Sequence, residues 1–300
     1  MLAISTAWKS DLGPDIKAIL SCIKETGFDA IELGYNFTQD KLQGIIPLLS
    51  DMNIKVVSVH NFCPLPYGVR RGRFATDYYR LSSLNERERR KAVEYTKATI
   101  DTALSVYCPI IVMHAGTVEF SRRYIKKLLN LYNQGKRNSG DFLKVRDKIL
   151  STREAKKAPH LDSLDKSLRE VLSYAHSVGV RVGLETRYYP NEIPNIEEAE
   201  VLLSRFSDRG LVYWHDVGHA EVNERFGITA HSDYLRKFAH CIAGMHLHDI
   251  KGIDDHLAPF SGEFDFSKLS AYMQDSLIKV IEAHPPATSQ EIKKAIAGLQ

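Results

Sequence analysis

The stretch Val180-Arg181-Val182-Gly183-Leu184-Glu185 is a short apolar run that ends in a carboxylate. Five other apolar runs also end, or nearly end, in a side chain able to bind a metal. They are Val56–His60, Ile110–His114, Leu211–Asp216, Ile242–His246 and Leu277–Glu282. Such a run is typical of a strand in a buried parallel sheet. In a (β/α)8 barrel the C-terminal ends of all strands converge on one face, where active sites lie. The six runs therefore predict a metalloenzyme built on such a barrel.

Strand and helix signals alternate along the whole chain. This favours an α/β fold with one TIM barrel domain over residues 1–300 rather than separate domains. We expect early strands at about 2–6 and 28–33 and a helix between Gly13-Pro14 and Gly27. Ser83-Leu84-Asn85-Glu86 suggests a capping box before the next long helix. The later expected helices are Leu42–Met52, Glu86–Val106, Leu161–Val178, Ile196–Phe206, His231–Ala239, Phe266–Asp275 and Ser289–Leu299.

Two connections are far longer than the usual 2–6 residues, at about 61–84 and 115–160. Both follow strands that end in histidine, so we expect both as long loops on the catalytic face. Long loops in compact domains are usually functional. The segment from Ser121 to Lys157 carries twelve Lys and Arg against three acidic residues, a local balance of +9 in a chain of net charge +3. It is either a solvated outer helix or a rim that attracts an anionic substrate.

The composition is that of an ordinary soluble globular protein, with 44% hydrophobic and 26% charged residues. No apolar run approaches the roughly 20 residues that span a bilayer. The first residues read as a strand rather than a signal peptide. Four scattered cysteines form neither a CxxC pair nor a disulfide framework. These features predict a cytoplasmic protein that does not associate with membranes.

The candidate metal ligands are the six strand-end residues and three more in the loops that follow. The full set is His60, His114, Glu185, Asp216, His219, His246, Asp254, His256 and Glu282. Imidazole and carboxylate ligands without thiolates suit zinc or manganese. Any one of these residues could instead be a hydrogen-bonded packing residue, but isolated carboxylates at a barrel mouth would be costly unless paired or metal-bound. His248 shares the side of His246, so it could support the ligands, whereas strand alternation points His215 away from Asp216.

At this point the chain resembles the xylose-isomerase-like barrels, which comprise sugar and sugar-phosphate isomerases or epimerases and the endonuclease IV enzymes. The resemblance spans nearly the whole chain. It lies in Phe28–Leu33, Val59–Pro64, Gly183–Glu185, His215–Ala220, Met245–Asp249 and Asp254–Asp265.

In the isomerase branch the resemblance implies one divalent ion (Zn, Mn, Co or Mg) held by Glu185, Asp216, His246 and Glu282. The two glutamates would also exchange the substrate proton, which is sensible because a cation acidifies the carbon next to a polarised carbonyl. The substrate would be a small sugar or sugar phosphate. The residues expected to bind it are His219, His248, Arg70 and Arg73.

In the endonuclease IV branch the resemblance implies three zinc ions that use all nine candidate positions to hydrolyse a phosphodiester, with nucleic acid as the partner. His60, His114 and His256 match this fuller set. However, the first strand leads into Ser5-Thr6-Ala7-Trp8, which lacks the Gly-Ala-His-like opening of the endonucleases, and no aromatic-interleaved DNA platform is evident. We therefore favour the isomerase, with one to three metal ions per chain. A barrel that binds a ligand without turnover is a third hypothesis, and a homodimer remains open.

Overall fold

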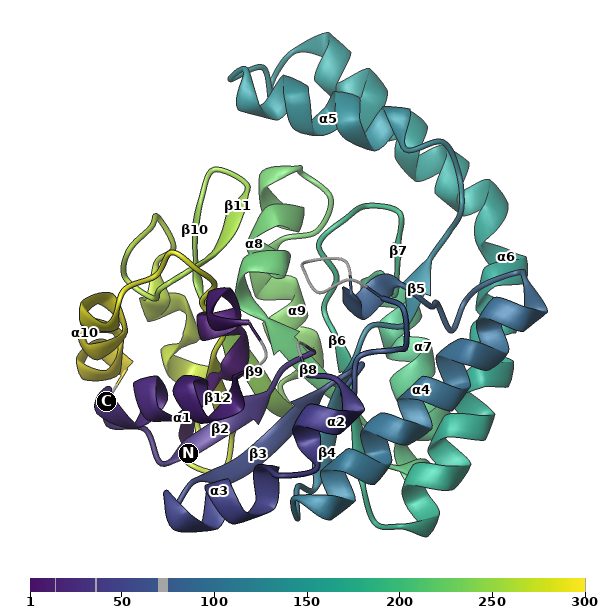
Figure 1. Ribbon diagram of the computed structural model, residues 1–300. Helices are drawn as coiled ribbons and strands as arrows, with labels where there is room; N and C mark the ends of the chain where they lie inside the picture. Colours follow the sequence, from purple (N-terminus) through teal and green to yellow (C-terminus); the bar gives the residue numbers. More distant parts are fainter. Residues whose placement is uncertain (14, 36, 70–74, 300) are drawn as a thin grey trace.

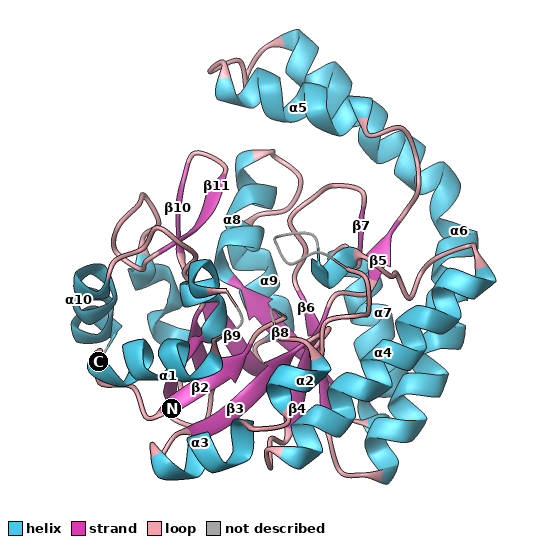
Figure 2. Cartoon of the chain, viewed as in Figure 1, coloured by secondary structure: helices cyan, strands magenta, loops and turns pink. Residues whose placement is uncertain are grey.

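The computed structural model describes residues 1–13, 15–35, 37–69 and 75–299. Eight parallel strands close into a barrel in the order β1-β12-β9-β8-β6-β4-β3-β2 (Figures 1 and 2), which confirms the predicted (β/α)8 fold. The barrel strands are β1 (Leu2–Ser5), β2 (Ala30–Leu33), β3 (Lys55–His60), β4 (Ile110–Met113), β6 (Arg181–Glu185), β8 (Leu211–Asp216), β9 (Ile242–Leu247) and β12 (Ile278–Ile281).

Helices surround this barrel in the described part of the chain. They are α1 (Ile16–Glu25), α2 (Gln39–Leu42), α3 (Ile45–Asp51), α4 (Glu86–Ser105), α5 (Arg123–Asn133), α6 (Gly140–Ser177), α7 (Ile196–Phe206), α8 (Val217–Arg225), α9 (His231–Phe238) and α10 (Ser289–Leu299). Short 3-10 helices lie at Thr6–Leu12, Ala75–Asp77, Ser207–Arg209 and Phe266–Tyr272. Among the described residues, none of the helices combines the length and the apolar character needed to cross a bilayer.

Two small antiparallel pairs lie outside the barrel. The strands β5 (Gly116–Thr117) and β7 (Glu192–Ile193) pair with each other, and β10 (Asp249–Lys251) pairs with β11 (Asp254–Leu257). Because β10 and β11 follow β9 directly, this hairpin stands on the face where the strands end (Figure 1).

The barrel interior is filled below the site by Trp214, which is fully buried. Glycines on the two neighbouring strands make room for its indole: a Cβ at Gly183 would lie 3.2 Å from the ring, and one at Gly244 would overlap it. The ring centroid of Trp214 lies 5.3 Å from that of His246. The Trp214 indole therefore packs beneath the candidate metal ligands and closes the barrel interior below them.

Several local expectations were wrong. The connection expected as a loop at about 115–160 contains α5 and the first half of α6, and α6 begins at Gly140 rather than Leu161. Its sequence keeps a helical stripe of buried residues (Phe142, Val145 and Ile149) through the basic segment. The cap of α4 is Asn85, which accepts from the backbone N–H groups of Arg87 and Glu88, so Ser83 forms no capping box. Finally, the segment after Asp216 that carries His219 was expected as a loop, but α8 starts directly after Asp216.

Candidate metal centre

Four of the predicted ligands meet at the mouth of the barrel. Glu185, Asp216 and His246 end or nearly end β6, β8 and β9, and Glu282 follows β12 directly. These four strands are neighbours in the barrel, so their ends lie side by side. One ligand atom from each of the four residues lies within 4.8 Å of the others. His246 Nδ1 is 3.0 Å from a carboxylate oxygen of both Glu185 and Glu282 and 3.6 Å from one of Asp216.

The three carboxylates of this cluster are almost completely buried. Burial disfavours ionisation, but the charges of neighbouring imidazoles outweigh it. His114 and His246 hold the pKa of Glu185 well below its usual value. His219 and His248 do the same for the pKa of Asp216, and His246 for that of Glu282. Three ionised carboxylates and an imidazole in one buried space form a donor set that suits a divalent cation of the zinc or manganese type.

His60 and His114 extend the cluster on one side. His60 Nε2 lies 3.3 Å from Glu185 Oε2, and His114 Nε2 lies 2.8 Å from the same oxygen. One ligand atom from each of His60, Glu185 and His246 also lies within 4.8 Å of the other two. Both imidazoles are therefore placed to share Glu185 with the main cluster.

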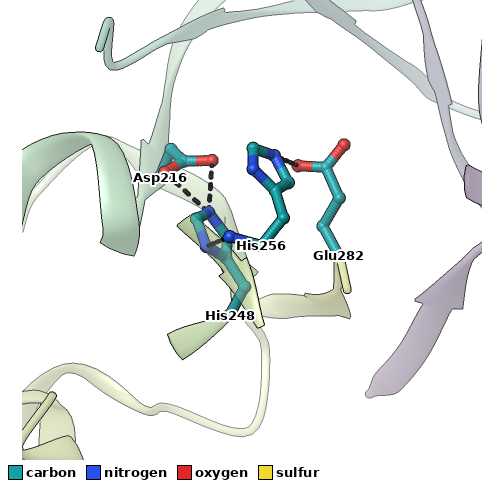
Figure 3. A group of neighbouring side chains, drawn as sticks. All are labelled: Asp216, His248, His256 and Glu282. Carbon is teal, nitrogen blue, oxygen red and sulfur yellow. Dashed lines mark hydrogen bonds and ion pairs between the residues drawn. The ribbon is translucent and has the colours of Figure 1, made fainter. Parts of the chain in front are cut away.

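A third group extends the cluster on the other side. Asp216 caps α8 by accepting a 2.7 Å hydrogen bond from the backbone N–H of His219, so the first turn of that helix returns His219 to the mouth. His219, Asp255 and His256 form a further group with mutually close ligand atoms. His256 also joins Asp216, His248 and Glu282, as Figure 3 shows.

The structure does not bring Asp254 to the other candidates. Residues alternate along β11, so the side chain of Asp254 is exposed while its neighbour Asp255 is buried. Asp255 Oδ1 lies 3.2 Å from His256 Nδ1, and Asp255 Oδ2 lies 3.6 Å from His219 Nε2. Asp255 thus occupies the place that we expected for Asp254.

Four of the imidazoles use one ring nitrogen outside the cluster. His60 Nδ1 donates to Asn61 O (2.9 Å), and His219 Nδ1 donates to Thr186 O (2.9 Å). His114 Nδ1 faces Asp77 Oδ1 at 3.0 Å, and His246 Nε2 faces Glu32 Oε2 at 3.1 Å. In each case the other nitrogen faces the cluster. Metal-binding histidines characteristically have such outer partners, which fix the ring and its tautomer.

His248 is placed differently. Its Nε2 donates to both oxygens of Asp216, at 3.0 and 3.1 Å, and its Nδ1 accepts from the backbone N–H of His256 at 2.9 Å. The rings of His248 and His256 are stacked with centroids 4.2 Å apart. His248 therefore orients Asp216 and the β10–β11 hairpin, while its predicted contact with substrate stays a prediction.

A cavity of about 60 Å³ lies over these groups. The segment 61–84 contributes Thr76 and Asp77 to its wall. The predicted substrate residues Arg70 and Arg73 lie outside the described residues. The other residues that line the cavity are Tyr35, His60, His114, Glu185, Arg187, Tyr188, Tyr189, Glu192, His219, Asp255, His256, Glu282 and His284.

Sequence reasoning missed Glu32, Asp77 and Arg187 as parts of the site. Glu32 lies within the predicted strand Phe28–Leu33 rather than at its end. Arg187 Nη2 lies 2.7 Å from Glu192 Oε1 and 3.4 Å from Asp77 Oδ2, which ties the 61–84 segment to the residues after β6. The signal available for Arg187 was its position two residues after Glu185; Asp77 offered none, because its loop has no strand pattern.

Relatives of the chain are known at the level of sequence and fold. It is 22% identical over 295 residues to an uncharacterized protein of Methanocaldococcus jannaschii, covering 94% of this chain and 91% of that one. The fold matches that of the 3-keto-D-glucoside 4-epimerase YcjR of E. coli, with a TM-score of 0.67, 15% identity and coverage of 99% and 98%.

The fold also matches an IolI protein whose solved structure holds a zinc atom, with a TM-score of 0.65, 14% identity and coverage of 99% and 97%. At these identities, the two structures show likeness of fold alone. The model of one family, the xylose isomerase-like TIM barrels, matches residues 20–299. The chain therefore belongs to the family of xylose isomerase-like TIM barrels, as the resemblance in its sequence predicted.

Proposed function

We propose that the protein is a divalent-metal-dependent isomerase or epimerase of a sugar or sugar phosphate. The observation that carries the proposal is the convergence of Glu185, Asp216, His246 and Glu282 on one buried space. The likeness of fold to a sugar epimerase is consistent with it. All four residues offer the oxygen and nitrogen donors that zinc, manganese or cobalt accept.

The arrangement of the two glutamates supports the assignment of a proton exchange to them. β6 and β12 are separated in the barrel by β8 and β9, so Glu185 and Glu282 approach the cluster from different sides. Both pKa values are held low, so both carboxylates are ionised and can accept a proton from a carbon acid. A bound divalent cation would supply the Lewis acidity that makes the carbon next to a sugar carbonyl acidic.

Other residues of the cavity would orient the sugar and exclude water. His219 presents Nε2 to the cavity, because its Nδ1 donates to Thr186 O. We assign this Nε2 to a hydrogen bond with a substrate oxygen. Thr76 and Asp77, from the described part of the 61–84 segment, line the cavity and would help to cover a bound sugar. Closure of this kind protects a reactive carbanionic species from solvent.

The first test is the metal content of the chain purified without added metal or chelator. The second is transfer of deuterium from solvent into ketoses and their phosphates, measured by NMR. Glu282→Gln should retain the fold and lose this exchange, whereas Glu263→Gln, at an exposed position of the same face, should retain it. Retained exchange in Glu282→Gln would overturn the assignment of that glutamate.

A second candidate function is hydrolysis of a phosphodiester at a multinuclear centre. The observation that favours it is the set of extra donors: His60 and His114 share Glu185, and His256 shares Glu282 and Asp216 through the groups described above. A one-metal isomerase does not need them. Close to three metal ions per chain, with hydrolysis of a nitrophenyl phosphodiester, would favour this function, and a single ion would favour the isomerase.

A further inference from the structure

The segment between β4 and β6 forms a structure that the proposed function does not use. We call residues 122–149, which comprise α5 and the first part of α6, the basic arm. It carries nine Lys and Arg residues against two aspartates, a net charge of +7. Figure 1 shows the arm curving out from the barrel wall and over the side on which β5, β7 and the β10–β11 hairpin lie.

The arm is held in place by an apolar stripe. Leu128, Phe142 and Ile149 are buried, and α5 packs along α6. At the barrel, Tyr132 and Phe226 of the turn after α8 have ring centroids 5.8 Å apart. Arg146 Nη1 donates to Gly227 O at 3.3 Å. These contacts fix the arm against the catalytic face.

Because the apolar stripe faces the protein, the cations face solvent. Eight of the nine basic side chains belong to exposed residues, and Arg146 is half-buried. Within the described chain, Arg146 is the one arm cation in an ion pair, and its partner is the adjacent Asp147. On the outer barrel helices, cations pair with acidic residues, as Arg89 does with Glu86 and Glu170. The arm therefore presents a positively charged surface on which few cations are paired with acidic side chains.

This surface lies next to the candidate metal centre. A Cβ at Gly252, in the turn of the β10–β11 hairpin, would lie 3.7 Å from Tyr132 Cε1. The same hairpin carries Asp255 and His256. A ligand held along the arm would therefore reach the edge of the cavity through the hairpin.

We propose that the basic arm is a docking surface for the phosphate backbone of a nucleic acid. At about 1.5 Å per residue, the 11 residues of α5 alone span roughly 16 Å. A single sugar phosphate would meet one or two of these cations. A strand with a phosphate at each nucleotide can neutralise several at once, with a gain from counterion release.

This inference goes beyond the proposed function and is independent of it. Holding a strand requires neither the metal ligands nor the proton exchange at Glu185 and Glu282. Metal content and sugar turnover can fail while strand binding holds, and the reverse can also occur. Strand binding together with phosphodiester cleavage would connect the arm to the second candidate function.

The test is fluorescence anisotropy of a labelled DNA duplex of mixed sequence with the full-length protein. We expect affinity to fall roughly a hundredfold between about 50 and 200 mM salt, as neutralisation of about four phosphates requires. Lys126→Glu/Lys127→Glu, which reverses two exposed cations of α5, should weaken binding at least about tenfold and flatten the salt dependence. Lys293→Glu/Lys294→Glu, an exposed pair of the same charge on α10, is the matched control.

Retained affinity in the arm variant, or an equal loss in the α10 control, would overturn the proposal. So would binding to phosphatidylserine vesicles that depends on the arm while DNA binding does not, because the partner would then be a membrane surface. Circular dichroism spectra and thermal unfolding curves that agree among all three proteins verify that the variants keep the barrel intact.

Discussion

Glu32 Oε2 lies 3.1 Å from His246 Nε2, on the side of the imidazole opposite to the three carboxylates of the metal centre. Ser58 donates to the same oxygen at 2.8 Å, and Glu32 is fully buried. Its other oxygen has no hydrogen-bond partner among the described residues. A buried carboxylate with one unused oxygen is costly, so its contact with His246 suggests a role in the site rather than in packing.

Glu32→Gln should lower the affinity for the divalent cation about 10- to 100-fold, which is the usual cost of removing the outer partner of a metal-binding histidine. The neutral amide no longer supports the electron density of the imidazole, although it retains the shape of Glu32. A competition titration with a chelating dye measures the affinity. Thermal unfolding of the metal-free protein shows whether the fold is intact, and unchanged affinity would contradict the role.

Gly218→Ala should damage the centre although alanine favours a helix over glycine by about 1 kcal/mol. Gly218 lies in the first turn of α8, and a Cβ there would overlap the ring of His248. The His248 ring must then move away from Asp216 and lose its hydrogen bonds to that carboxylate. We expect weaker metal binding without loss of helix. Gly140→Ala, where a Cβ meets no atom within 4 Å, is the control; equal metal affinity in both variants would contradict this account.

His60→Ala distinguishes a multinuclear centre from a single ion. If His60 and His114 hold an ion of their own with Glu185, the variant should lose about one ion per chain and retain those of the neighbouring groups. Elemental analysis measures the loss, with His176→Ala on the exposed face of α6 as the control. An unchanged count would assign His60 to packing.

The affinity for metal should rise with pH. Burial and Arg187 lower the pKa of His114, but the charges of Asp77 and Glu185 outweigh them and raise it to about 9 in the metal-free protein. A protonated imidazole cannot bind a cation, so binding must release that proton below pH 9. Apparent affinity at this position should therefore increase up to about tenfold per pH unit between pH 7 and pH 9 and then level off. Calorimetry in buffers of different ionisation enthalpy counts the protons released, and a flat profile would contradict the shift.

The barrel and most of the candidate ligands could be predicted from the sequence because strand ends leave a local pattern. Glu185 and Asp216 end apolar runs, and the parallel topology then brings such ends together whatever their separation along the chain. His219 was predicted because it closely follows Asp216 at the end of a strand, whereas the helix that returns its side chain to the mouth was not predicted.

The features that could not be predicted depend on tertiary contacts that leave no pattern in the sequence. The choice between Asp254 and Asp255 depends on which face of a three- or four-residue hairpin strand points inward, and both residues have the same chemistry. Asp77 lies in a short 3-10 helix that no sequence pattern marked, and Glu32 reads as an ordinary polar residue of a predicted strand. The helical arm was foreseen only as one alternative, a solvated outer helix, because the run of basic residues marks no helix boundaries and the buried stripe of Phe142, Val145 and Ile149 is a weak signal.

One helix, α6, forms both the outer wall of the barrel beside α4 and the root of the basic arm. Just beyond the arm, this helix is anchored by Arg153, whose guanidinium lies 2.7 Å from Glu198 of α7. The second helix of the arm is therefore the extension of a barrel-wall helix rather than part of an appended domain. Lengthening or shortening this single element would change the reach of the positive surface over the mouth without altering the eight strands that carry the chemistry.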